Sequence, residues 1–311
     1  MARIGTSDLD VFPLCLGGNV FGWTADEQQS FAVLDAYAAA GGNFIDTADV
    51  YPAWAEGNSG GESETIIGRW LARRGRRDDL VIATKVGQLS TAKGLSAANI
   101  KVAAEDSLRR LGTDHIDLYY AHIDDTEVPL AETLGAFDEL VKAGKVRHLA
   151  ASNYGTDRLA EALEVSKREN LASYVALQPH YNLVEREGYE GKLAALVAIE
   201  GLSAVPYWGL AKGFLTGKYR PGVEVDSPRA AGASAYLDER GLRVLAVLDE
   251  LAANHRTSVA AVALAWLTAQ PTVAAPIASA RTLDQLTDLL AAATLELAED
   301  EVQRLTEASA R

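Results

Sequence analysis

The sequence has a single cysteine, no long apolar run and no excess of basic residues. Cys15 has no partner for an internal disulfide, which is typical of a protein from a reducing compartment. No stretch approaches the roughly 20 apolar residues that a membrane helix needs. Residues 1–5 also lack the apolar core of a signal peptide. We therefore expect a cytoplasmic protein with no membrane partner.

The chain is strongly acidic. It carries 43 acidic and 29 basic side chains, which give a formal net charge of −14 at pH 7. Nucleic-acid binding requires a basic stripe, so no nucleic-acid partner is expected, although a few local cations could hold a phosphate ligand. The 311 residues are 48% hydrophobic and contain no obvious linker or low-complexity segment. We expect residues 1–311 to form one domain.

Short apolar segments alternate with longer amphipathic segments along the chain. The pattern predicts eight strands, at residues 14–16, 43–45, 80–84, 116–120, 146–150, 174–177, 202–205 and 273–276. The clearest helices are predicted at residues 27–40, 62–73, 97–110, 130–142, 157–168 and 193–199. Strands that alternate with helices indicate a parallel sheet, and eight such units indicate a closed (β/α)8 TIM barrel. A doubly wound sheet is the alternative, but no Gly-x-Gly-x-x-Gly segment opens a dinucleotide fold.

Several segments are additional to the eight strand–helix units. The connection between the last two strands can hold two extra helices, preceded by a Pro- and Gly-rich segment at residues 221–235 that is typical of a mobile loop. The further predicted features are helices at 240–253, 258–269 and 299–309, a hairpin from 3–6 and 9–12, and helix N-caps at Ser96, Thr126 and Thr156. The hairpin is expected to cover the bottom of the barrel.

Polar side chains follow three neighbouring predicted strands. Asp46 and Tyr51 come after the second strand, Lys85 ends the third, and His122 ends the fourth. Active sites of α/β barrels lie at the carboxyl ends of the strands. An acid, a phenol, an ammonium and an imidazole are therefore expected to meet there. No metal ion is expected among them.

This set of groups suits the reduction of a carbonyl, which needs a hydride at carbon and a proton at oxygen. Tyrosine is a weak acid, with an ordinary pKa of about 10. A cation about 4 Å away contributes roughly 4 kcal/mol at an effective dielectric constant of about 20. Lys85 is therefore expected to bring the pKa of Tyr51 toward neutrality. Asp46 would partly offset this effect, but it would keep Lys85 charged and fix its position, and His122 would orient the carbonyl oxygen.

Each of these residues also has an ordinary structural explanation. An isolated tyrosine after a strand is usually packing, a terminal lysine is usually solvated, and a lone histidine is often a satisfied core residue. Asp46 could be a helix cap. Lys85 could instead be the nucleophile of a Schiff-base aldolase. The joint placement of all four at one face of the barrel favours the reductase.

The chain resembles the aldo-keto reductase family. Asp46-Thr47-Ala48-x-x-Tyr51, Lys85 and His122 resemble its catalytic tetrad. Further resembling segments are Gly17-Gly18, Gly60-Gly61-Glu62-Ser63-Glu64, Leu108-Arg109-Arg110-Leu111-Gly112, Lys142-Ala143-Gly144-Lys145-Val146-Arg147, Ser152-Asn153, Gln178 and Tyr181-Asn182-Leu183. Together these segments are highly specific and cover essentially the whole chain.

The resemblance implies an NADP(H) site. Ser152, Asn153 and Gln178 would hold the carboxamide, and Tyr207 would stack on the nicotinamide ring. The full set implied to bind the cofactor is Gly18, Asn19, Asp46, Ser152, Asn153, Gln178, Tyr207, Trp208, Gly209, Leu210, Lys212, Gly213, Lys218, Ser279, Arg281, Gln285 and Asp288.

Barrel geometry points to the same phosphate site. Barrels often bind phosphate between the loops after strands seven and eight, at a helix N-terminus, where Ser279 and Arg281 lie. The planar fork of an arginine suits a phosphate, so NADP is expected rather than NAD. The sequence departs from the family at Leu289, where asparagine is usual, at Trp208-Gly209 and at Ile123-Asp124-Asp125.

We expect NADPH-dependent reduction of an aldehyde or ketone, in which Tyr51 is the proton donor. Phe21, Trp23 and Trp54, with His122 and Tyr236, are expected to shape the substrate pocket. The alternative is a non-enzymatic NADP-binding regulatory subunit of the same fold, like the channel-associated proteins that this family resembles.

Overall fold

Eight parallel strands form a barrel. The structure is a computed structural model that describes residues 1–311. The strands are β3 (Cys15–Gly17), β4 (Phe44–Asp46), β5 (Val81–Val86), β6 (Ile116–Ala121), β7 (Val146–Ser152), β8 (Tyr174–Gln178), β9 (Ser203–Ala204) and β10 (Ile277–Ala278). Their order in the sheet is β10-β3-β4-β5-β6-β7-β8-β9. The Ala274 amide donates to the Ala204 carbonyl at 3.0 Å, and the Ile277 amide donates to the Pro206 carbonyl at 2.8 Å. These bonds close the ring, so the predicted barrel is confirmed.

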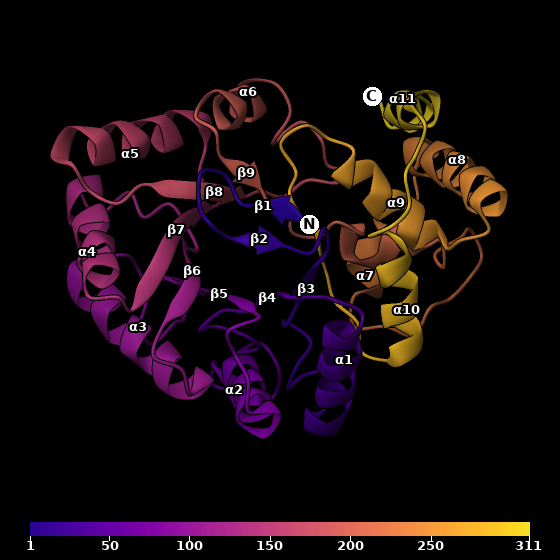
Figure 1. Cartoon of the computed structure of the whole chain (residues 1–311). Helices are drawn as coiled ribbons and strands as arrows, with labels where there is room; N and C mark the ends of the chain where they lie inside the picture. Colours follow the sequence, from indigo (N-terminus) through magenta and orange to yellow (C-terminus); the bar gives the residue numbers. More distant parts are fainter.

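Helices surround the strands (Figure 1). They are α1 (Glu27–Ala39), α2 (Glu62–Arg74), α3 (Ala97–Leu111), α4 (Leu130–Lys142), α5 (Thr156–Glu169), α6 (Lys192–Ile199), α9 (Val259–Thr268) and α10 (Leu283–Ala291). Most of them bury one face, whereas α9 is buried on all sides. In α3, for example, Ile100, Ala104, Leu108 and Leu111 are buried, at the spacing of one helical face. None of the helices combines the length and the apolar character that crossing a bilayer requires.

The remaining elements lie in the long connection after β9 and at the C-terminus. They are the 3-10 segment η1 (Ala211–Thr216), α7 (Ala230–Ser234), α8 (Glu239–His255) and α11 (Glu299–Ala308). Figure 1 shows α8 and α11 together at the outer side of α9. The segment 221–235 was expected to be a loop throughout, but it contains the short helix α7.

Two of the three predicted N-caps are wrong. Ser96 does cap α3, because its hydroxyl accepts a hydrogen bond from the Asn99 amide at 3.3 Å. The N-cap of α4 is Pro129 rather than Thr126. The N-cap of α5 is Gly155, and Thr156 lies inside the helix. Before α4, Asp125 accepts from the Glu127 amide at 3.1 Å, and Thr126 therefore lies in a turn rather than at the start of the helix.

The last strand was predicted at residues 273–276, but β10 begins at Ile277. Val273 makes only an isolated bridge to Ala204. Pro276 has no N–H to donate to a ladder, although its carbonyl accepts from the Cys15 amide at 3.0 Å. The regular pairing with β3 therefore starts one residue after the proline.

A small hairpin covers the amino end of the barrel, as predicted. It pairs β1 (Ala2–Arg3) with β2 (Asp10–Val11) in antiparallel fashion. Ile4, Leu9 and Val11 are buried in one cluster with barrel-interior side chains. This end is therefore filled with apolar side chains, and the polar residues gather at the opposite end.

Candidate active site

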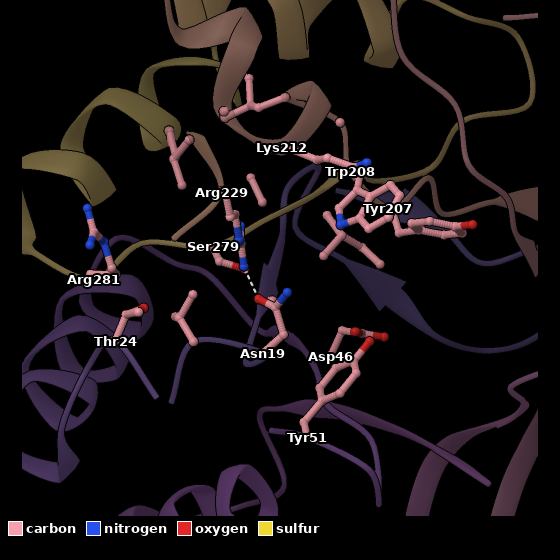
Figure 2. A pocket seen from close by; sticks show the side chains of 18 of the residues that line it. Asn19, Thr24, Asp46, Tyr51, Tyr207, Trp208, Lys212, Arg229, Ser279 and Arg281 are labelled. Carbon is pink, nitrogen blue, oxygen red and sulfur yellow. Dashed lines mark hydrogen bonds between the residues drawn. The ribbon is translucent and has the colours of Figure 1, made fainter. Parts of the chain in front are cut away.

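A cavity of about 880 Å³ opens at the carboxyl ends of the strands. Figure 2 shows Asp46 and Tyr51 at one end of it and Arg281 at the other. The predicted site residues that line it are Asn19, Trp23, Asp46, Tyr51, Trp54, His122, Ser152, Asn153, Gln178, Tyr207, Trp208, Gly209, Leu210, Lys212, Gly213, Lys218, Ser279, Arg281, Gln285 and Asp288. The structure thus brings most of the predicted residues to one cavity.

Strand periodicity explains why polar side chains meet at its floor. Side chains two apart on a strand share a face, so Asp46 follows Phe44 inward and Lys85 follows Ala83 inward. Phe44 and Ala83 both belong to the apolar cluster inside the barrel. The same alternation applies to the pairs Tyr120 and His122, Ala150 and Ser152, and Ala176 and Gln178. Each of these strands thus ends in one polar layer above the apolar core.

Lys85 is the centre of that layer. Its side chain is fully buried, and its ammonium donates to Asp46 Oδ2 at 2.6 Å, to the Thr47 carbonyl at 2.8 Å and to the Tyr51 hydroxyl at 3.3 Å. Asp46 Oδ1 accepts from the Gln178 amide at 2.9 Å. These bonds use all three ammonium hydrogens, so Lys85 is fixed between the carboxylate and the phenol.

The protonation states follow from burial and charge. Burial raises the pKa of Tyr51, and Asp46 adds to this, while Lys85 opposes it; the net direction is upward. The expectation that Lys85 would bring this pKa toward neutrality is therefore wrong. Burial lowers the pKa of Lys85, but Asp46 and Tyr51 more than offset it, so that pKa is raised. At neutral pH the site therefore holds a protonated phenol beside a charged ammonium.

His122 is a neutral imidazole. Burial, helped by Lys85, holds its pKa well below the ordinary value. Its ring packs edge-on to that of Tyr51, with centroids 5.9 Å apart, and its Nδ1 has no hydrogen-bond partner. A neutral imidazole carries one N–H, which can be donated to an oxygen beside Tyr51.

The next part of the cavity wall is a chain of side-chain hydrogen bonds. Asn153 has a left-handed backbone with φ of 60°. Its amide nitrogen donates to the His122 carbonyl at 2.9 Å, and its amide oxygen accepts from the Tyr207 hydroxyl at 2.9 Å. The Ser152 hydroxyl donates to the Gln178 carbonyl at 3.0 Å. These contacts hold the polar groups at the ends of β7 and β8, and the ring of Tyr207, against the same part of the cavity.

A tight turn after Tyr207 has several residues with left-handed backbone. Trp208, Ala211, Lys212 and Gly213 all have positive φ values. Such conformations cost roughly 1–3 kcal/mol each for residues other than glycine, and they concentrate at functional sites. The Asn182 side chain holds the turn by donating to the Trp208 carbonyl at 2.9 Å. Turns of this kind direct successive N–H groups to one side, which suits an anion.

The far end of the cavity lies at the N-terminus of α10. The Ser279 hydroxyl donates to Asn19 Oδ1 at 2.8 Å. The Arg281 amide donates to Gln285 Oε1 at 2.9 Å, next to the N-cap Thr282. The positive end of a helix dipole and an arginine therefore face the same part of the cavity.

One cation of the site was missed by the sequence analysis. Arg229 lies in the segment 221–235 and, in Figure 2, stands between the Tyr51 end and the Arg281 end. Its guanidinium lies over the Trp23 ring at 5.5 Å, and burial together with Arg281 lowers its pKa. Other lining residues that were missed include Thr24, Gln88, Thr216 and Ser227. The sequence did offer a signal for Arg229, because it is a basic residue in the connection after the seventh strand, where barrels often bind phosphate.

Four residues assigned to the site do not line the cavity. Lys85 is fully buried, with Asp46 and Tyr51 between its ammonium and the cavity. Gly18 supports the floor, because a Cβ there would come within 2.8 Å of Ser63 Oγ, and its amide donates to the Asp46 carbonyl at 2.7 Å. Phe21 is fully buried in the core. Tyr236 instead donates its hydroxyl to Glu185 at 2.9 Å. Phe21 and Tyr236 are therefore not part of the cavity wall, contrary to the prediction.

The similarity to known proteins covers almost the whole chain. Residues 13–310 match the sequence model of the aldo/keto reductase family. The chain is 34% identical to Protein tas of Escherichia coli, over 96% of this chain and 94% of that protein. It is 33% identical to a probable voltage-gated potassium channel subunit beta of Oryza sativa (92% and 88%) and 31% identical to norsolorinic acid reductase B of Dothistroma septosporum (96% and 79%). The chain therefore belongs to the aldo/keto reductase family of oxidoreductases.

Proposed function

We propose that the protein is an NADPH-dependent carbonyl reductase in which Tyr51 protonates the substrate oxygen. The observation that carries this proposal is the fully buried Lys85 ammonium, held between Asp46 and Tyr51 at the floor of the cavity. A phenol beside a fixed cation can release its proton to an oxygen that gains negative charge.

The cavity suits a nucleotide with several phosphates. Lys212, Lys218, Arg229 and Arg281 line it, in a chain whose formal net charge is −14. Cationic side chains that gather in one cavity repel one another, and a bound anion relieves this repulsion. Arg281 and the helix N-terminus would hold the phosphate that distinguishes NADP from NAD. Lys212, the turn after Tyr207 and Arg229 would hold the pyrophosphate.

The other half of the cavity would hold the nicotinamide. Ser152, Asn153 and Gln178 supply donors and acceptors for the carboxamide, and Tyr207 supplies a flat ring held by Asn153. When bound, the reduced nicotinamide supplies the hydride. This assignment places the hydride source next to Asp46 and Tyr51, at the end of the cavity opposite Arg281.

The side chains at the floor of the cavity would then have separate roles in the transfer of the proton. His122, as a neutral imidazole, donates its N–H to the carbonyl oxygen and orients it. Tyr51 keeps its proton until that oxygen becomes basic, because its pKa is raised in the free protein. When the proton leaves, Lys85 stabilises the phenolate, and Asp46 keeps Lys85 in place. The reverse sequence oxidises an alcohol.

The substrate side of the cavity is aromatic. Trp23 and Trp54 pack edge to face with centroids 5.8 Å apart, and Trp54 contacts Tyr51 in the same way at 5.6 Å. Trp54 is 49% exposed, so part of its ring is free to contact a ligand. This wall favours an aldehyde or ketone with an apolar or aromatic body.

Two alternatives make different predictions. The similarity to a potassium channel subunit beta favours a non-enzymatic NADP-binding subunit as the second candidate. A Schiff-base aldolase needs a free amine, but the Lys85 ammonium is buried and bonded to a carboxylate. The structure gives no support to that chemistry.

The test is the rate of NADPH oxidation, followed by absorbance, against a panel of aldehydes and ketones. We expect turnover with NADPH and weaker turnover with NADH. Tight NADPH binding with no turnover across the panel would favour the regulatory subunit. Trapping of a carbonyl compound on Lys85 by borohydride would favour the aldolase.

A further inference from the structure

A second buried polar cluster lies beside the tetrad, and the proposed reaction does not use it. It consists of Asp49, Glu64, Thr84, Arg110 and Tyr119. Asp49 is only 1% exposed, and neither of its carboxylate oxygens has a hydrogen-bond partner. The Tyr119 hydroxyl is also buried without a partner. A charged carboxylate in such a place is strongly disfavoured.

The nearby cations are bonded to other carboxylates. Glu64 is fully buried, and it accepts from Arg110 Nε and from the Thr84 hydroxyl, both at 2.6 Å. Lys85 is bonded to Asp46 at 2.6 Å. Asp49 therefore has no cation of its own, and it has Glu64 as a neighbour of like charge.

The groups that face Asp49 come from every element around it. They are Glu64 of α2, Lys85 of β5, Arg110 of α3 and Tyr119 of β6. Burial, with the charge of Glu64, raises the pKa of Asp49 to about 7, although Arg110, the Val50 backbone and Lys85 oppose the rise. Asp49 is thus a buried acid that changes charge in the neutral range.

Asp49 is also joined directly to the tetrad. Its amide donates to the Lys85 carbonyl at 3.2 Å, and it lies on the loop that leads from Asp46, the last residue of β4, to Tyr51. The loop is tightly packed, since a Cβ at Gly60 would come within 2.9 Å of the Asp49 carbonyl. The backbone of Asp49 is therefore held directly against that of Lys85.

We propose that Asp49 is a positioning residue whose charge state adjusts the acidity of Tyr51. This inference rests on the proposed function. With Asp49 neutral, no negative charge is added beside the phenol. With Asp49 ionised, its charge raises the pKa of Tyr51, and the phenol gives up its proton less readily.

The expected effect is moderate. Asp49 contributes less to the pKa of Tyr51 than burial, Lys85 and Asp46 do, and shifts of about one pKa unit are typical for groups in folded proteins. Since proton transfer is only partial in the transition state, the reduction rate should fall about threefold to tenfold as Asp49 ionises.

The activity test is the pH profile of the single-turnover rate of NADPH oxidation in the wild type, Asp49→Asn and Glu64→Gln. The wild-type rate should fall with an inflection near pH 7. Asparagine matches the neutral acid in shape, so Asp49→Asn should remove that inflection. Glu64→Gln should free Arg110 to pair with Asp49 and move the inflection to lower pH. An unchanged inflection in Asp49→Asn would overturn the proposal.

A second test needs no turnover. The infrared difference spectrum of the wild type between pH 6 and pH 8 should lose the C=O stretching band of a buried carboxylic acid, and Asp49→Asn should lack this change. If the band is absent from the wild type, the proposal is wrong even if the enzyme is active. If the band titrates but no carbonyl compound is turned over, only the proposed reaction fails.

Discussion

The Lys85 ammonium lies 3.3 Å from the Tyr51 hydroxyl and 2.6 Å from Asp46, with its side chain fully buried. Of these two partners, the carboxylate is the stronger one, because it is charged. The ion pair therefore fixes the ammonium, and the ammonium in turn fixes the environment of the phenol.

Replacement of Lys85 should damage both stability and activity. In Lys85→Met, Asp46 would be left as a buried carboxylate without its cation, and loss of one partner of a buried pair costs about 3–5 kcal/mol. The double variant Asp46→Asn/Lys85→Met removes both charges and should recover most of that stability. Neither variant should reduce a carbonyl. Denaturant unfolding and NADPH oxidation would check this. Recovery of turnover in the double variant would show that the cation is not needed.

The two arginines of the cavity should affect the two cofactors differently. A charged hydrogen bond contributes about 1.5–3 kcal/mol, or about tenfold to a hundredfold in affinity. Arg281→Ala should weaken NADPH binding by this amount and leave NADH binding almost unchanged. Arg229→Ala should weaken both, because the pyrophosphate is common to both cofactors. Titration of the intrinsic tryptophan fluorescence measures all four affinities, and equal losses of NADH and NADPH in Arg281→Ala would contradict the phosphate assignment.

The aromatic wall should affect substrate binding more than chemistry. In Trp54→Ala, the contacts with Trp23 and Tyr51 are lost, and an aromatic pair contributes about 0.5–1.5 kcal/mol beyond its buried area. We expect KM for an aryl aldehyde to rise about tenfold. The KM of a small aliphatic aldehyde should change less, which provides the control. A large fall in kcat with constant KM would indicate that Trp54 positions Tyr51 instead.

Stability should depend on pH through Asp49. Its pKa is about 7 in the folded protein and 3.8 in its ordinary state, so between these values only the folded form keeps the proton. Unfolding then releases a proton, and the free energy of unfolding falls as pH rises, by about 1.4 kcal/mol per pH unit, with no further loss above pH 7. In Asp49→Asn, which has no carboxyl group at this position, the free energy of unfolding should not fall with pH in this way. The gap between the two unfolding free energies should therefore widen from pH 4 to pH 7, and a constant gap would be inconsistent with a neutral Asp49.

The fold could be predicted from the sequence because its main signal is periodic. Strands such as β5 and β6 are buried along their whole length and stand out as apolar runs between amphipathic helices. The positions of Asp46, Lys85 and His122 followed from the same pattern, since each directly ends such a run. The β10 strand was misplaced because only two residues pair regularly after Pro276.

The features that were missed depend on loops and burial. Arg229 reaches the cavity from a segment whose composition indicates a loop but not its path. The pKa of Tyr51 was predicted in the wrong direction because the effect of the neighbouring cation was considered without the cost of burial. Phe21 was assigned to the aromatic substrate pocket, but its ring packs into the core.

The central claim is that Tyr51 is the proton donor, and Tyr51→Phe tests it most directly. The variant keeps the ring and its contact with Trp54 and loses only the hydroxyl. We expect carbonyl-dependent NADPH oxidation to fall by about a hundredfold to ten-thousandfold, as for loss of a general acid, while the NADPH dissociation constant stays nearly unchanged. Turnover close to that of the wild type in Tyr51→Phe would contradict the account.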